Sequence, residues 1–137
     1  MSDEIDYARG VAEAVLDRLG DLAPPWRVLA VERHRESQAP PSGLAAPDSL
    51  VVAIGRDEGD EASVRVYFSL DVPRDQAVAV TAAQIQDHAI EETGGAPLPP
   101  CPGHRHPMSA RAVDGLAGWV CPRDVAHHRE PIVPHRA

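Results

Sequence analysis

Apolar residues recur every three or four positions over the first twenty residues of the chain. This spacing places them on one face of a helix, and the early acids Asp3 and Glu4 suit the positive end of a helix dipole. The pattern predicts a helix that ends at Gly20, because glycine commonly terminates helices. The predicted apolar face comprises Ile5, Ala8, Val11, Ala12, Val15 and Leu19.

Three apolar segments with the character of strands follow. Trp26–Val31 comes after a pair of prolines, and Leu50–Ile54 is an uninterrupted apolar run. In Val64–Leu70 apolar and polar residues alternate, which is typical of a strand with one buried face. The last two segments are expected to pair as a hairpin.

A second helix is predicted from Pro73 to about Thr93. Proline is favoured in the first turn of a helix, and Gly94 and Gly95 provide the stop. The order helix, three strands, helix predicts an α+β fold, in which both helices cover one face of a three-stranded antiparallel sheet. The apolar stripe of the second helix is formed by Val78, Thr81, Ala82, Ile85 and Ala89.

The composition of the chain changes at Ala96. Eight of the 14 prolines, five of the seven histidines and both cysteines lie beyond it. We therefore expect an α+β domain over residues 1–95 and a proline- and histidine-rich module over residues 96–137. Because only five of the 137 residues are aromatic, the core is expected to be light, and a metal ion or a partner subunit would stabilise it.

The charge is unevenly divided along the chain. Residues 1–100 contain 8 arginines and 18 acids, a balance of −10, whereas residues 101–137 contain 5 arginines and 3 acids, a balance of +2. An acidic body disfavours binding to nucleic acids and to anionic membranes. The longest apolar run, Leu50–Ile54, is too short to span a bilayer, and the N-terminus does not resemble a signal peptide. A cytoplasmic location is expected, where paired cysteines favour metal binding over a disulfide.

Two short motifs of the same design contain both cysteines. Each is a Cys-Pro turn with a residue of ligand type three positions after the cysteine, so two metal ligands lie on one tight loop. Proline stiffens each loop and lowers the entropic cost of ordering it. The pairing of thiol and imidazole groups predicts a zinc site. The motifs are Cys101-Pro102-Gly103-His104 and Cys121-Pro122-Arg123-Asp124.

The segment between the motifs predicts a β-hairpin that brings the two loops together. Asp114 and Gly115 are a favoured pair for a two-residue turn, which joins strands at 108–113 and 116–120. The register then pairs Val113 with Leu116 and Ala110 with Trp119.

With these features, residues 101–124 resemble a zinc ribbon of the rubredoxin-knuckle type. In that family two Cys-Pro-x-Cys turns flank a hairpin, and here His104 and Asp124 replace the second cysteine of each turn. The resemblance implies a zinc ion held by Cys101, His104, Cys121 and Asp124. Three further histidines compete for the fourth position: His106, His127 and His128. The rest of the chain resembles short uncharacterised actinobacterial proteins, a likeness that implies no function.

Two other interpretations of these residues remain open. His88 shares a helix face with Glu91 and Glu92, which would suit a small metalloenzyme with an open zinc site, although an ordinary solvated helix surface is the favoured explanation. Four arginines near Trp119 would suit a nucleic-acid-binding ribbon, although a tryptophan packed on the hairpin is the commoner arrangement. These arginines are Arg105, Arg111, Arg123 and Arg129.

The sequence therefore favours a small protein with a structural zinc ion and no catalytic activity. We expect a binding or adaptor role, with another protein or a second copy of the chain as the partner. The competing interpretation is a proline-rich tail in which the two cysteines are buried or form a disulfide.

Overall fold

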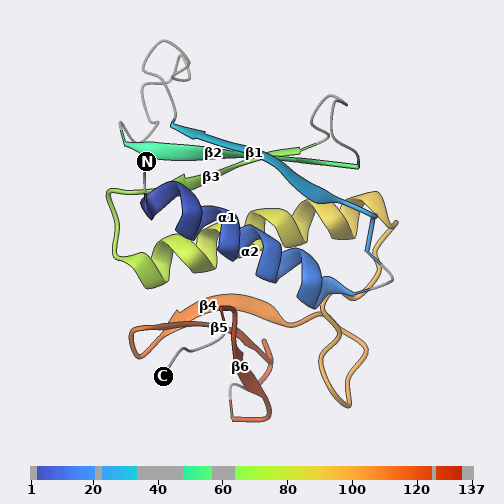
Figure 1. Cartoon of the computed structure of the whole chain (residues 1–137). Coiled ribbons are helices and arrows are strands. Elements are labelled where there is room, and N and C mark those ends of the chain that lie inside the picture. Colours follow the sequence, from blue (N-terminus) through green and yellow to red (C-terminus); the bar gives the residue numbers. More distant parts are fainter. Residues whose placement is uncertain (1–2, 21–22, 34–47, 57–63, 125, 134–137) are drawn as a thin grey trace, which may run out of the picture.

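The computed structural model describes residues 3–20, 23–33, 48–56, 64–124 and 126–133, which form three layers (Figure 1). A pair of helices lies between two three-stranded antiparallel sheets. The α+β class expected from the sequence is confirmed. In chain order the elements are α1 (Asp3–Leu19), β1 (Arg27–Arg33), β2 (Ser49–Gly55), β3 (Val64–Ser69), α2 (Arg74–Glu92), β4 (Ser109–Val113), β5 (Leu116–Val120) and β6 (Arg129–Pro131).

Helix α1 ends at the residue before Gly20, where the sequence predicts. Gly20 has a φ of +83°, a left-handed conformation that costs glycine little and ends the helix. The predicted apolar face is buried apart from Ile5, which is partly exposed. Each fully buried valine or leucine contributes about 1.5–3 kcal/mol, so this face holds α1 against β1, β2 and α2.

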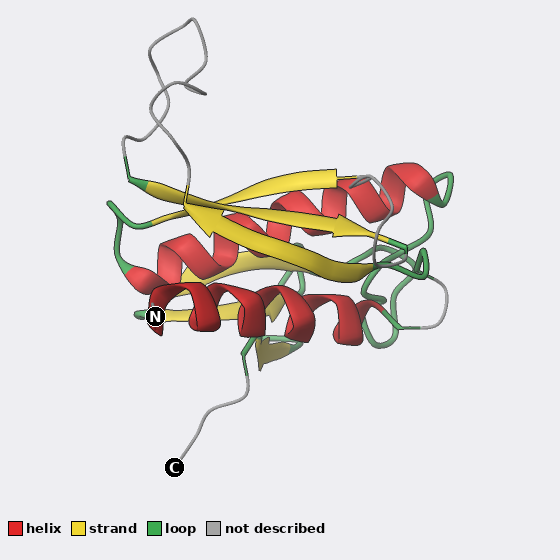
Figure 2. Ribbon diagram, turned by 45° about the horizontal axis from the view of Figure 1, so that its top comes forward, coloured by secondary structure: helices red, strands yellow, loops and turns green. Residues whose placement is uncertain are grey.

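The first sheet has the order β1-β2-β3, with β2 in the centre. Leu50, Val52 and Ile54 of this strand are fully buried in the core, whereas Val51 and Ala53, on the opposite face, are partly exposed. In β3 the buried residues Val64, Val66 and Phe68 alternate with exposed ones, as predicted. Both helices cover one face of this sheet, and the two views in Figures 1 and 2 agree on this arrangement.

Helix α2 contacts both sheets, β3 on one side and β4 and β5 on the other. Its buried residues accordingly extend beyond the predicted stripe and include Ala77, Ala79 and Gln86. A helix that is covered on two sides needs small side chains, because they allow close approach of both neighbours. The alanine-rich sequence of α2 meets this requirement.

The second sheet is built on the predicted hairpin. Asp114 and Gly115 have φ values of 54° and 79°, which a tight two-residue turn of type I′ requires. The predicted register is confirmed, with Val113 opposite Leu116 and Ala110 opposite Trp119.

A third strand, β6, pairs with the other edge of β5 and was not predicted. Its three residues, Arg129–Pro131, are too few to show a strand periodicity in the sequence.

One hydrophobic core extends through all three layers. Leu98, Met108, Trp119 and Ile132 belong to the same cluster of buried residues as the apolar face of α1. The boundary between residues 1–95 and 96–137 stays a prediction, and the core crosses it. In the part of the chain described here, neither helix has the length and apolar character needed to cross a membrane.

Candidate metal centre

The first loop of the candidate site connects α2 to β4 and folds back on itself. The N–H of His104 donates to Cys101 O at 3.0 Å, and the N–H of Cys101 donates to His106 O at 3.1 Å. Pro102 and Gly103 occupy the two central positions of the turn, with Gly103 at a φ of +77°. This is the residue pattern of a type II turn. The Cys-Pro-Gly-His sequence therefore brings Cys101 and His104 to the same side of one loop.

The second loop begins directly after β5 and leads into β6. The N–H of Cys121 donates to His128 O at 3.1 Å, and the N–H of His127 donates to Asp124 O at 2.9 Å. Within the turn, the backbone N–H groups of Arg123 and Asp124 act on the Cys121 thiol and lower its pKa. Backbone donors of this kind stabilise a thiolate.

Four side chains from the two loops converge. The ligand atoms of Cys101, His104, His106 and Cys121 all lie within 4.8 Å of one another. His104 Nδ1 is 3.5 Å from Cys101 Sγ and 3.6 Å from Cys121 Sγ. Both cysteines are buried, with exposed fractions of 2% and 0%. The convergence of the two loops was predicted from the sequence, and all four residues were among the predicted candidate ligands.

The separations fit a tetrahedral metal site. With metal–sulfur bonds of about 2.3 Å and metal–nitrogen bonds of about 2.05 Å, a tetrahedron separates sulfur from nitrogen by about 3.6 Å and nitrogen from nitrogen by about 3.3 Å. Both distances from His104 Nδ1 to sulfur match the first value. The distance from His104 Nδ1 to His106 Nε2 is 3.0 Å, a few tenths of an ångström shorter than the second value, and all the other separations are within 4.8 Å. The four side chains could therefore hold a metal ion.

The ring of His106 is oriented for coordination by its other nitrogen. His106 Nδ1 lies 3.1 Å from the carbonyl oxygen of Pro107, which can only accept a hydrogen bond. Nδ1 therefore carries the proton, and Nε2 presents its lone pair to the site. A backbone carbonyl that fixes the tautomer is a usual companion of metal-binding histidines.

The protonation states of the cluster also suit a cation. Burial lowers the pKa of His104, and the nearby His127, His106 and Arg123 lower it further, so its imidazole is neutral at pH 7. Burial raises the pKa of Cys101, and the hydrogen bond with Cys121 adds to this effect. Burial acts in the same direction on Cys121, but its backbone donors and Cys101 outweigh it, so the pKa of Cys121 is lowered. The proton that remains on Cys101 is the one that a cation would displace.

The other predicted ligands lie outside the cluster. Asp124 is exposed, and its Oδ1 accepts a hydrogen bond of 3.0 Å from the N–H of Ala126. His127 stacks on His104 with ring centroids 4.3 Å apart, and its Nε2 donates to Pro102 O at 2.6 Å. His128 Nε2 is 2.9 Å from Glu130 Oε1. The arrangement thus favours His106, an alternative in the sequence analysis, over Asp124 as the fourth ligand.

The catalytic and the nucleic-acid interpretations gain no support from the structure. His88, Glu91 and Glu92 are exposed on α2 and do not belong to the cluster. Trp119 has an exposed fraction of 0%, so its ring faces the core and offers no surface on which a base could stack.

Gln86 is a supporting residue that the sequence analysis missed. Its side chain on α2 is buried, and its Nε2 donates to Leu98 O at 3.0 Å and to Met108 O. These two carbonyls lie on either side of the first loop, so Gln86 fixes the position of the loop against the helix. The signal in the sequence was the position of Gln86, a polar residue close to the apolar stripe of the second helix. A buried polar side chain usually has a specific hydrogen-bond partner.

Comparison with known proteins yields no relative from which a function could be transferred. No protein-family model matches the chain, and no curated protein or solved structure matches it.

Proposed function

We propose that the protein binds one zinc ion through Cys101, His104, His106 and Cys121, and that this ion has a structural role. The observation that carries the proposal is the position of His104 Nδ1, at 3.5 and 3.6 Å from the two cysteine sulfurs and at 3.0 Å from His106 Nε2. Two thiolates and two neutral imidazoles in tetrahedral positions form a donor set that zinc prefers.

A structural role is favoured over a catalytic one by the number of ligands. Four protein ligands fill a tetrahedral zinc site, whereas catalytic sites keep one position for water or substrate. The ion would join the loop that follows α2 to the loop between β5 and β6, and so close the open end of the second sheet. We place this protein in the cytoplasm, where thiols remain reduced and available to zinc.

We further propose that the function is non-catalytic binding of another protein. The zinc ion would stabilise a sheet whose outer face is partly apolar, with Leu116 exposed to 68%. Exposed apolar residues that cluster on one face commonly mark interaction sites.

The metal content of purified protein tests the zinc proposal. Elemental analysis should give about one zinc per chain, and both Cys101→Ser and Cys121→Ser should lose it, because serine is a poor zinc ligand. Both variants should also unfold at a lower temperature, since zinc binding adds to the free energy of folding. His88→Gln is the matched control, because this histidine is exposed on α2 outside the cluster.

Two results would contradict the proposal. One is protein that contains no metal when purified without chelators and takes up none from a zinc solution. The other is zinc that is retained in both cysteine variants but lost in His88→Gln, which would move the site to α2.

A further inference from the structure

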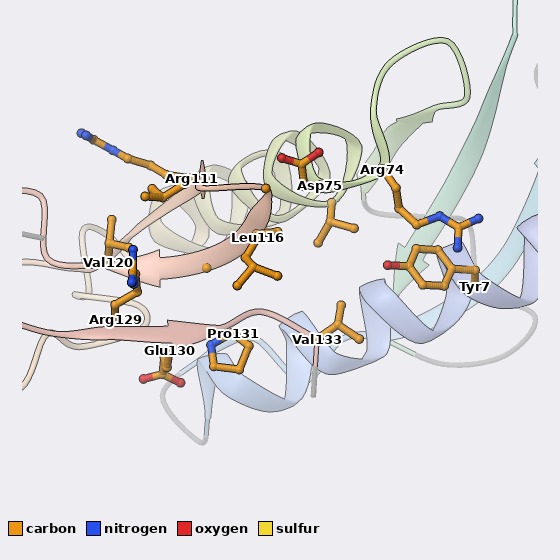
Figure 3. Close-up of a pocket in the computed structure, with 15 residues that line it drawn as sticks. Tyr7, Arg74, Asp75, Arg111, Leu116, Val120, Arg129, Glu130, Pro131 and Val133 are labelled. Atoms are coloured by element: carbon orange, nitrogen blue, oxygen red, sulfur yellow. The ribbon is translucent and has the colours of Figure 1, made fainter. Parts of the chain in front are cut away.

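A groove with a volume of about 600 Å³ lies away from the metal centre, between the second sheet and the N-terminal parts of the two helices (Figure 3). Its volume is in the range of known ligand sites. The central part of the lining is apolar and comes mainly from the turn of the hairpin, β5 and the segment that follows β6. These residues include Val113, Leu116, Val120, Pro131 and Val133.

The alternation of side chains in β5 explains why this surface is apolar. The side chain of Trp119 lies in the core. Because side chains alternate along a strand, Leu116 and Val120 of β5 lie on the opposite face of the sheet. Leu116 lies on that opposite face and is exposed to 68%, the largest value among the large apolar residues that the structure describes. A strand that is apolar on both faces inside a protein is normally covered on both. Among the described residues, α2 covers one face of β5. On the other face Val120 is fully buried at the base of the groove, whereas Leu116 is exposed in it.

The ends of the groove are basic. Arg111 and Arg129 lie at one end, Arg74 lies at the other, and Leu116 lies between them (Figure 3). The guanidinium of Arg74 is held 4.3 Å from the ring centroid of Tyr7, which keeps this charge at the rim.

Two acidic side chains line the groove, and one of them is already neutralised. Glu130 accepts two hydrogen bonds from Arg18, at 2.8 and 2.9 Å, which leaves Asp75 as the remaining acid. Arg129 is in turn 3.7 Å from the carboxylate of Asp114. The charges left to meet a ligand are those of Arg74 and Arg111 against that of Asp75, so the groove remains locally basic on a chain with a net charge of −8. Such a surface attracts acidic partners and is complementary to them.

We infer that this groove binds an apolar segment of a partner protein that has acidic residues at both ends. The apolar centre would bury the partner's aliphatic side chains, and the arginines at the two ends would pair with its carboxylates. The inference rests on the proposed binding function and identifies the surface that performs it. The metal centre would stabilise the same surface, because Cys121 directly follows Val120 and the second loop closes just before Arg129.

Fluorescence anisotropy with a synthetic peptide tests the inference. The probe is a labelled peptide in which alternating leucines and valines are flanked by two aspartates at each end. The peptide should bind the full-length protein, and a version with arginines in place of the aspartates should bind at least about tenfold more weakly, because like charges oppose each other across an interface. Raising the salt concentration should weaken binding of the acidic peptide.

Matched variants assign the binding to the groove. Leu116→Asp should weaken binding at least about tenfold, because it places a charge at the apolar centre. Val80→Asp is the control, since Val80 is also an exposed apolar residue, at 57%, but lies on α2 outside the groove. Arg111→Glu should weaken binding by about tenfold, whereas Arg65→Glu, an exposed arginine on β3, should leave it unchanged.

Three outcomes would overturn the inference. The first is protein that contains zinc but does not bind the acidic peptide. The second is binding that Leu116→Asp and Val80→Asp weaken equally. The third is a dimer in analytical ultracentrifugation that Leu116→Asp dissociates, which would make a second copy of the chain the occupant. Peptide binding by protein that contains no zinc would support the groove and contradict only the metal proposal.

Discussion

At the scale of single residues, backbone groups act on two of the four side chains in the candidate metal centre. The carbonyl of Pro107 fixes the tautomer of His106, and the N–H groups of Arg123 and Asp124 lower the pKa of Cys121. The two loops are held in shape by their own backbone hydrogen bonds. Replacing one ligand side chain should therefore lower the metal affinity while the conformation of the loops changes little.

The fourth ligand can be identified by comparing His106→Gln with Asp124→Asn. We expect His106→Gln to weaken zinc binding by more than about 100-fold, since even the loss of a group outside the ligand shell costs 10–100-fold. Asp124→Asn should leave the affinity nearly unchanged, because the Oδ1 of Asp124 binds the backbone of Ala126. Competition with a chromophoric chelator measures both affinities. The opposite ranking would restore Asp124 as the ligand that the zinc-ribbon resemblance implies.

At the scale of elements, helix α2 contributes to the core and also positions the first loop of the candidate metal centre. Its buried Gln86 spans the two ends of the first loop by donating to the carbonyls of Leu98 and Met108. A single side chain of α2 thus holds the first loop, which has no regular secondary structure of its own, against the helix.

Replacing Gln86 by leucine should destabilise the protein by about 2–4 kcal/mol. The volume of the side chain is nearly conserved, but two buried carbonyls lose their donor, and an unsatisfied buried group costs about 1–3 kcal/mol. Gln76→Leu is the matched control, since Gln76 is exposed on the same helix. Urea unfolding of both variants measures the free energies. A loss in Gln86→Leu no larger than that in Gln76→Leu would contradict the role assigned to this residue.

At the scale of the whole molecule, one ion pair joins the first helix to the last strand. Arg18 donates from Nε and from Nη2 to the two carboxylate oxygens of Glu130, 112 positions later in the chain. The hydrogen bond from Arg18 lowers the pKa of Glu130, burial opposes this effect, and a hydrogen bond from His128 lowers it further. The pair therefore favours the folded state when Glu130 is ionised.

This ion pair should make part of the stability depend on pH. Because the pKa of Glu130 is lowered by folding, its contribution is complete above the ordinary value of 4.5 and declines as the pH falls through the lowered value. A double-mutant cycle with Arg18→Met and Glu130→Gln should give a coupling free energy of about 1 kcal/mol at pH 7, a modest value because both side chains are partly exposed. The coupling should be smaller at pH 3. A coupling that is equal at both pH values would show that ionisation of Glu130 does not contribute.

The sequence by itself determined the elements that depend on local geometry. Helix and strand periodicities located α1, α2 and the strands of the first sheet, because side chains repeat every 3.6 residues in a helix and every two in a strand. The Asp114-Gly115 turn determined the register of β4 and β5, since few residue pairs tolerate two successive positive φ values. The Cys-Pro motifs likewise identified the two loops that meet at the candidate site.

Only the tertiary structure decided which histidines join the cysteines. His104 is three residues from Cys101, but the orientation of His106 depends on the return of the first loop to Pro107, and the positions of His127 and His128 depend on β6. The pairing of Arg18 with Glu130 and the groove beside Leu116 depend in the same way on the packing of the second sheet against the helices. These contacts join residues far apart in the chain, and no local pattern in the sequence specifies which distant side chains meet. These contacts are determined by the packing of the elements, because packing sets the positions of the loops relative to one another.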